Sequence, residues 1–238
     1  MLADYNDLLA ATVAFILSHM VLSSRPLRAM LVQRLGDGGF RAGYSILVIL
    51  TFVWMLLAYG AAPYYPVWEP PPWTAAVAAV IMIPATLLFV IGLATPSPTA
   101  VGGEQRLDVK DARSPAVGIL SVTRHPFLCG VTLFAIAHLL ANGDLATIIL
   151  MVGLALLSVA GMMHIDARRA ASLGPLWGPI AISTSRLPFL AIAQGRAEFD
   201  LAGIGWWRIL LAVVVYCIFI AFHGVIAGVP LFAGLHAG

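Results

Sequence analysis

The sequence predicts an all-α polytopic membrane helix bundle of about six transmembrane helices, with both termini outside the cytoplasm. Of its 238 residues, 61% are hydrophobic and only 10% are charged, whereas a soluble domain carries about 25% charged residues. Six apolar segments approach the roughly 20 residues that a helix needs to cross a bilayer. The basic residues gather in alternate connections between these segments. We therefore expect one membrane domain over residues 1–238 that contacts membrane lipid and binds no nucleic acid.

The first three predicted helices cover about residues 4–23, 43–62 and 73–94. A basic stretch separates the first from the second. The connection from the second to the third, residues 63–72, is rich in proline and aromatic residues. Aromatic side chains favour the membrane–water interface and prolines stiffen a turn, so this connection is typical of an interfacial loop.

The last three predicted helices cover about residues 126–141, 144–167 and 206–228. Pro126 suits the first position of a helix, where its missing N–H is not needed. Asp144 suits the N-cap of the fifth helix. Because only an Asn-Gly pair precedes Asp144, we expect the fourth and fifth helices to form a tight hairpin.

Two further apolar stretches do not qualify as independent spans. Residues 116–122 could extend the short fourth helix at its inner end. Residues 170–195 are moderately apolar but interrupted by three prolines. We expect the latter to lie at the inner membrane interface or to be partly re-entrant.

The basic residues orient the predicted bundle. All of them lie in or at the edge of three alternate connections, and the other connections and both termini carry none. Under the positive-inside rule these three connections are cytoplasmic. With an even number of helices, both termini then lie on the opposite side. The 13 positions are Arg25, Arg28, Arg34, Arg41, Arg106, Lys110, Arg113, Arg124, Arg168, Arg169, Arg186, Arg196 and Arg208.

Histidines are the strongly ionisable residues left at membrane depth, since the acidic and basic residues lie outside the cores of the predicted helices. His19, His138, His164 and His223 lie on the first, fourth, fifth and sixth helix. An ionisable side chain inside a bilayer indicates a functional site by default. Neutral imidazole is the usual axial ligand of haem iron, and helix bundles hold such cofactors in their core. A hydrogen bond across helices is the alternative role for each of these histidines.

The depth of each histidine limits which of them can share one iron. At about 1.5 Å per residue, His19 lies about 9 Å and His164 about 6 Å inside the cytoplasmic edge. His138 lies about 6 Å from the outer edge, and His223 is also in the outer half. The residues therefore leave two sets open as ligands, an inner pair of His19 with His164 and an outer pair of His138 with His223.

A second constellation lies at the predicted cytoplasmic face. Arg124 and His125 precede the fourth helix, and Asp166 ends the fifth helix on the same side. A helix N-terminus beside an arginine attracts anions. We expect these two clusters to face each other around a headgroup or a cofactor, with ordinary charged flanking of a membrane helix as the alternative.

Several motifs together make this chain resemble the NnrU family. They are residues 18–19 (SH), 23–28 (SSRPLR), 122–126 (VTRHP), 137–144 (AHLLANGD), 165–169 (IDARR) and 205–208 (GWWR), with His223. The resemblance covers essentially the whole chain. The family is named from bacterial nitrogen-oxide respiration, so the resemblance implies a multi-pass protein of the bacterial inner membrane.

Relatives of that family include the 15-cis-zeta-carotene isomerase branch, which this chain resembles more weakly and which uses haem b. That resemblance implies haem ligation by His19 and His138. An alternative cysteine ligand of that branch falls at Ala135 here. The implied function is either isomerase-like chemistry on a lipid-soluble polyene or a non-enzymatic role in nitrogen-oxide reduction.

A second resemblance concerns Arg124, His125 and Pro126, followed by Gly130. This pattern is similar to the RHPxxxG motif of the isoprenylcysteine carboxyl methyltransferases and phospholipid methyltransferases. It implies that Arg124, His125 and Asp166 position S-adenosylmethionine for a methyltransferase reaction. A binding or assembly partner without a cofactor is the third alternative.

Overall fold

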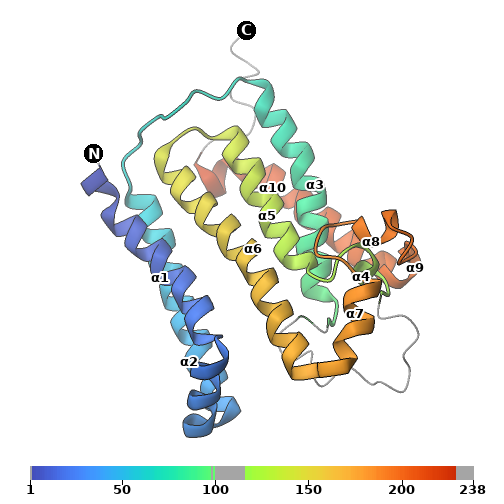
Figure 1. The fold of residues 1–238 in the computed structure, drawn as a ribbon. Helices are drawn as coiled ribbons and strands as arrows, with labels where there is room; N and C mark the ends of the chain where they lie inside the picture. Colours follow the sequence, from blue (N-terminus) through green and yellow to red (C-terminus); the bar gives the residue numbers. More distant parts are fainter. Residues whose placement is uncertain (1, 98, 100–115, 229–238) are drawn as a thin grey trace. The chain divides into compact units, whose positions relative to one another are not determined.

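The computed structural model describes residues 2–97, 99 and 116–228, and its elements of more than one residue are all helices there, as predicted (Figure 1). The predicted basic positions Arg106, Lys110 and Arg113 lie outside the described residues. The six predicted apolar segments correspond to α1 (Asn6–Leu22), α2 (Arg25–Ala61), α3 (Trp73–Ala94), α5 (Pro126–Ala141), α6 (Leu145–Leu173) and α10 (Trp206–Ala227).

Length and composition make these helices suitable for a membrane. In the described part of the chain, four helices are long and apolar enough to cross it: α2, α3, α10 and α6 taken together with α7 (Trp177–Ser183). Helices α1 and α5 are apolar but shorter, with 17 and 16 residues. The predicted count of six spans and the predicted orientation stay predictions.

Helix α2 begins at Arg25, and not near residue 43 as predicted. Its first turn follows Ser24, which is extended, and a proline stands near the helix start, where proline is tolerated. The helix is interrupted at Gly36, whose φ of 72° and ψ of 164° are not helical. The sequence between Arg25 and Gly36 is rich in good helix formers, and its charge alone made it appear to be a loop.

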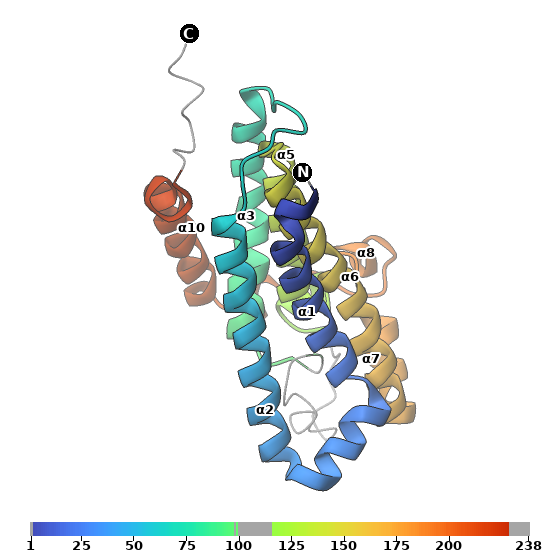
Figure 2. The same ribbon diagram turned by 90° about the vertical axis from the view of Figure 1, so that its left-hand side faces the viewer.

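The chain forms two compact units. Unit 1 consists of the described residues of Met1–Pro70 and Asn142–Leu157. In it, α1 and α2 run side by side as a helical hairpin (Figure 2). The indole N–H of Trp54 donates to Asp7 Oδ1 at 3.0 Å, and the hydroxyl groups of Ser18 and Thr51 lie 3.4 Å apart. Polar pairs of this kind join neighbouring helices in an apolar setting.

The connection after α2 packs on the start of α6 within unit 1. The backbone N–H of Val67 donates to the carbonyl of Gly143 at 2.7 Å, and that of Leu145 donates to the carbonyl of Tyr65 at 3.0 Å. Asp144 Oδ1 accepts the N–H of Thr147 at 3.0 Å, which confirms its predicted role as N-cap.

Unit 2 consists of the described residues of Pro71–Ala141 and Ser158–Gly238. Its closest helix pair is α3 with α5, which lie side by side (Figures 1 and 2). Glycines allow this approach. A Cβ atom on Gly92 would lie 2.5 Å from the backbone nitrogen of Phe127, and one on Gly130 would lie 2.7 Å from that of Phe89. Small residues at a helix crossing are typical of membrane bundles.

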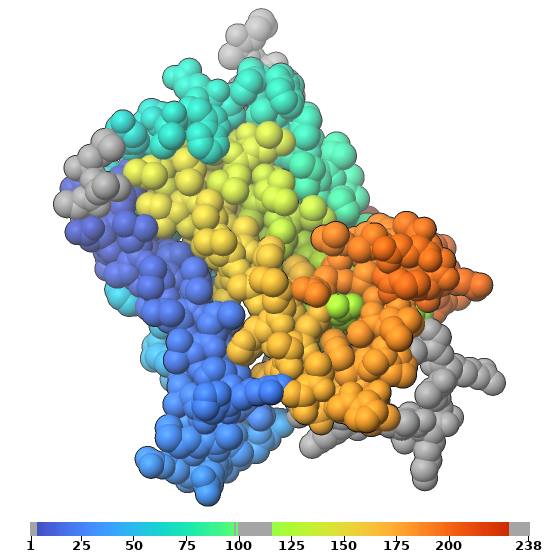
Figure 3. All heavy atoms as spheres, viewed as in Figure 1, coloured from blue at the N-terminus to red at the C-terminus, as the bar shows by residue number. Residues whose placement is uncertain are grey.

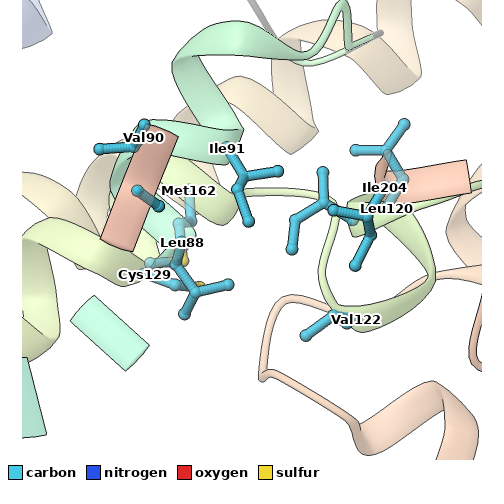
Figure 4. Close-up of a cluster of buried hydrophobic side chains, with 10 residues drawn as sticks. Leu88, Val90, Ile91, Leu120, Val122, Cys129, Met162 and Ile204 are labelled. Carbon is cyan, nitrogen blue, oxygen red and sulfur yellow. The ribbon is translucent and has the colours of Figure 1, made fainter. Parts of the chain in front are cut away.

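An apolar core joins the short helices of unit 2 to the long ones (Figure 4). Two short helices contribute, α4 (Ile119–Val122) and α9 (Leu201–Ile204). Residues 116–122 therefore do not extend α5, because the chain leaves the helical conformation at Thr123. The buried members of the core are Leu88, Val90, Ile91, Ile119, Leu120, Val122, Cys129, Met162, Ile204 and Ala212.

The proline-interrupted stretch 170–195 is a series of short helices. After α6 come the 3-10 helix η4 (Gly174–Leu176), then α7, and then α8 (Leu190–Ala193) after an irregular loop. The loop between α7 and α8, residues 184–189, contributes to the candidate site below.

Candidate functional site

The segment between α4 and α5, residues 123–125, is fixed by the loop that follows α7. Arg124 donates its backbone N–H to the carbonyl of Ser185 at 3.0 Å. The hydroxyl of Thr123 donates to the carbonyl of Arg186 at 2.9 Å. Because Thr123 is fully buried, these bonds also satisfy polar groups that would otherwise be costly to bury.

Arg124 and Asp166 form a buried ion pair in unit 2. The Nε–H of Arg124 donates to Asp166 Oδ1 at 3.0 Å, and its Nη2–H donates to Oδ2 at 2.7 Å. The two side chains keep 9% and 12% of their surface exposed. A two-point contact of this kind is the strongest arrangement for a guanidinium and a carboxylate. The predicted approach of Arg124, before α5, to Asp166, on α6, is thus present as a direct contact, while a headgroup or cofactor between the two clusters stays a prediction.

His125 shares the same carboxylate. Its Nε2 lies 2.8 Å from Asp166 Oδ1, and the ring is 1% exposed. Because an ionised carboxylate only accepts hydrogen bonds, Nε2 carries a proton and donates it to that oxygen. The ring is thereby held in one orientation.

The side chain of Arg186 and the backbone of Thr184 also belong to this cluster. The Nε of Arg186 lies 3.2 Å from Asp166 Oδ2, and the Arg186 side chain is 49% exposed. The Nη1–H of Arg124 donates to the carbonyl of Thr184 at 3.2 Å. The sequence did not single out Arg186 or Thr184 for this site, because no periodicity relates an irregular loop to a residue on a distant helix.

The ion pairs of the cluster all converge on Asp166. Asp166 accepts from Arg124 and His125 and also pairs with Arg186. The three residues predicted to position a cofactor are therefore held by one another. Their arrangement ties the start of α5, α6 and the loop after α7 together, and Arg186 is the member whose side chain is half exposed.

Asp200 fixes the segment before α4, although the two are far apart in the sequence. Its Oδ2 accepts the backbone N–H of Gly118 at 2.8 Å, and its Oδ1 accepts that of Gly203 at 2.9 Å. These two hydrogen bonds hold the pKa of the Asp200 carboxyl below its usual range, and the bond from Gly118 contributes most to that shift. The carboxylate thus clamps α9 to the start of the α4 segment.

His19, one of the two predicted iron ligands, lies on α1 in unit 1. Its Nδ1 is 2.9 Å from the carbonyl of Phe15, one helical turn earlier. Since a carbonyl only accepts, Nδ1 carries the proton, and in the neutral ring the lone pair belongs to Nε2. The Phe15 ring packs edge-on at 4.5 Å between centroids, and the Tyr44 ring lies at 6.1 Å.

His138, the other predicted ligand, repeats this arrangement on α5 in unit 2. Its Nδ1 is 2.9 Å from the carbonyl of Phe134, four residues earlier. The Phe134 ring lies 4.0 Å from the imidazole between centroids. The two predicted ligands therefore share a Phe-x-x-x-His pattern and the tautomer with a lone pair on Nε2.

The alternative ligands, His164 and His223, are both partly exposed. His223 on α10 is close enough to His138 for an electrostatic interaction, so the structure brings the predicted outer pair into one neighbourhood of unit 2. The inner pair joins His19 of unit 1 to His164 of unit 2, and it stays a prediction.

The sequence was compared with known proteins. A family described as NnrU protein matches residues 7–231. The chloroplastic 15-cis-zeta-carotene isomerase of Zea mays is 33% identical over 81 residues, which make up 34% of this chain and 22% of that protein. The chain thus matches about a fifth of the length of this curated relative. No solved structure matches the chain.

Proposed function

This chain belongs to the NnrU family, and from that premise we propose that it is an integral membrane haem-b protein with isomerase-like chemistry on a lipid-soluble polyene. The observation that carries this proposal is the common geometry of His19 and His138. Both rings use Nδ1–H on the carbonyl four residues earlier, at 2.9 Å. A second hydrogen bond of this kind orients a metal-ligating histidine and raises the basicity of its other nitrogen.

The residues fit a haem group by their donor chemistry. His19 and His138 would offer Nε2 to the iron, and their phenylalanine neighbours would pack on the ligand ring. Imidazole-ligated haem supplies redox chemistry whose potential the ligands and the apolar surroundings tune. The protein's own part is to orient the imidazoles through Phe15 and Phe134 carbonyls and to exclude water. His164 and His223 remain the alternative ligands.

The polyene class rests on the isomerase relative. Its name states a carotene substrate, and a carotene is a long apolar polyene that dissolves in the same bilayer as the helices. The apolar helices described above offer a route for such a molecule. A bacterial inner membrane as the location and the link to nitrogen-oxide reduction follow from the earlier resemblance and stay predictions.

The methyltransferase alternative is less well supported. It requires Arg124, His125 and Asp166 to bind S-adenosylmethionine, yet these side chains bind one another in a buried cluster. A cofactor would have to replace those bonds. We therefore assign Arg124, His125 and Asp166 a structural role.

Haem content tests the proposal directly. The full-length protein, expressed with sufficient haem and purified in detergent, should be red and show a Soret band that shifts on reduction with dithionite. His19→Ala and His138→Ala, made singly, should alter that band or remove it. His164→Ala and His223→Ala are the matched controls and should leave it unchanged. A colourless wild-type protein would refute the haem assignment.

A separate measurement tests the substrate class. Cells that accumulate a cis-polyene should convert it to another isomer when they express the wild-type protein, as measured by chromatography of the pigment extract. His138→Ala should abolish this conversion while its expression level stays normal. A haem-loaded protein that leaves every tested polyene unchanged would retain the cofactor assignment and refute the isomerase one.

A further inference from the structure

The end of α7 and the loop between α7 and α8 present apolar side chains on the surface of unit 2. Ile182, Leu187 and Phe189 are 67%, 65% and 55% exposed. Phe189 has a positive φ of 64°, and it is the one non-glycine residue with a positive φ in the described part of the chain. This conformation is costly for a side chain of its size. Orange atoms of this region form part of the surface in Figure 3. Exposed apolar side chains in a membrane protein are suited to the lipid interface.

Arg186 lies within this apolar stretch of the sequence, and hydrogen bonds from buried residues fix its backbone. Its carbonyl accepts the hydroxyl of Thr123 at 2.9 Å and the thiol of Cys129 at 3.3 Å, so its backbone is anchored to buried residues. Its Nε faces Asp166. The remaining atoms of the guanidinium, Nη1 and Nη2, belong to a side chain that is 49% exposed. The anchored backbone and the contact with Asp166 thus hold in place a side chain that is half exposed.

The charges of the cluster do not balance. Asp166 supplies one negative charge, and it faces the two permanent positive charges of Arg124 and Arg186. Asp166 lies closer to Arg124, at 2.7 Å, than to Arg186, at 3.2 Å. Among the described residues, Arg186 therefore shares its carboxylate partner with a closer guanidinium, and a guanidinium edge suits the oxygens of a phosphate.

We propose that Arg186, framed by Ile182, Leu187 and Phe189, binds the phosphate of an anionic membrane-lipid headgroup. The apolar frame favours a lipid over free phosphate, because acyl chains can cover those side chains while the headgroup meets the cation. The buried Arg124–Asp166 pair orients the guanidinium of Arg186 through Asp166. This site does not include the candidate haem ligands His19 and His138.

Lipid titration of the full-length protein tests this site. Native mass spectrometry of the detergent-purified protein would count bound phosphatidylglycerol over a range of lipid concentrations. Arg186→Gln should weaken that binding about tenfold or more, since a hydrogen bond to a charged group contributes roughly 1.5–3 kcal/mol. Arg34→Gln removes the same charge from another exposed position and should change the affinity less than about twofold. Arg186→Lys keeps the charge without the planar fork and should fall between the two.

Further measurements distinguish the source of the phosphate. Leu187→Ser should weaken phosphatidylglycerol binding but leave competition by inorganic phosphate unchanged. If inorganic phosphate binds as tightly as the lipid, the lipid assignment is wrong. Unchanged phosphatidylglycerol binding by both Arg186 variants, with normal helicity and monodisperse elution, would overturn the site itself.

Discussion

At the residue scale, Asp166 shows how much a single carboxylate on α6 can determine. It faces two guanidinium groups and an imidazole while its own side chain is 12% exposed. Placing charges in such a setting is costly, and the cost is recovered only while every partner is present. The cluster should therefore respond much more strongly to the loss of Asp166 than an exposed ion pair does to the loss of its carboxylate.

Replacing Asp166 by Asn should reduce the free energy of unfolding by about 3 kcal/mol or more, because Arg124 would stay buried without its counter-charge. Asp37→Asn is the matched control. Asp37 pairs with Arg28 and Arg41, but its side chain is 46% exposed, and exposed pairs contribute up to about 1 kcal/mol. Denaturant titration in detergent, followed by circular dichroism, measures both losses. Equal losses in the two variants would contradict the role assigned to Asp166.

Asp200 should give the protein a stability component that depends on pH. Its folded pKa is lowered by the backbone donors of Gly118 and Gly203. A lowered pKa stabilises the fold above the unfolded pKa of about 3.9, and the contribution is lost as pH falls through the folded value. Asp200→Asn should therefore lower the melting temperature at pH 7, and the gap from wild type should narrow toward pH 3. Glu198→Gln, two residues away, controls for loss of a carboxylate. A gap that stays constant with pH would refute this effect.

At the element scale, the α3–α5 pair depends on glycines more than on large apolar side chains. A Cβ on Gly130 would meet Phe89 N at 2.7 Å and Ala85 O at 2.8 Å, and both atoms belong to the backbone of the facing helix. Gly130→Ala should therefore push the helices apart and lower stability by about 1–3 kcal/mol. Gly60→Ala on α2 is the control, since a Cβ there has open space, and helix propensity favours alanine. Thermal unfolding of both variants in detergent checks this. An unchanged Gly130→Ala protein would show that α3 and α5 can separate freely.

Helix bounds show what the sequence could predict and where it could not. The ends of α3 and α5 follow from apolar length and from the Trp73 and Pro126 boundaries, and the structure places them as predicted. The predicted start of α2, near residue 43, was wrong, since the helix begins at Arg25. Flanking charge marks a membrane boundary and does not mark the end of a helix. The short helices α8 and α9 were not predicted, since four-residue elements carry no detectable periodicity.

The candidate site shows the same division. The contact of Arg124 with Asp166 was predictable, because both residues flank helices on the same predicted side of the membrane. The contact of Arg186 with that carboxylate was not, because it depends on backbone bonds between two irregular loops. The common geometry of His19 and His138 was also hidden, although the Phe-x-x-x-His pattern in each helix was available as a signal.

At the scale of the whole molecule, the orientation of the bundle is open to direct measurement. Cysteines at position 64 or 34, in a background without Cys129 and Cys217, report which side of the membrane each connection faces. Tyr64 is 79% exposed in the aromatic connection, and Arg34 is exposed in the basic stretch of α2. A membrane-impermeant maleimide should label Tyr64→Cys in intact cells and Arg34→Cys only after lysis, because arginines resist transfer across the bilayer.

A third position extends this measurement to α5, the shortest of the six apolar helices. Helix α5 has 16 residues, which cover about 24 Å at 1.5 Å per residue, short of a ~30 Å hydrocarbon core. If α5 nevertheless crosses, four crossings by α2, α3, α5 and α6 separate positions 34 and 198, and both lie on the same side. Glu198→Cys should then be protected in intact cells, as Arg34→Cys is. Labelling of Glu198→Cys from outside, with Arg34→Cys protected, would require an odd number of crossings. In that case α3, α5 and α6 would not all span the membrane.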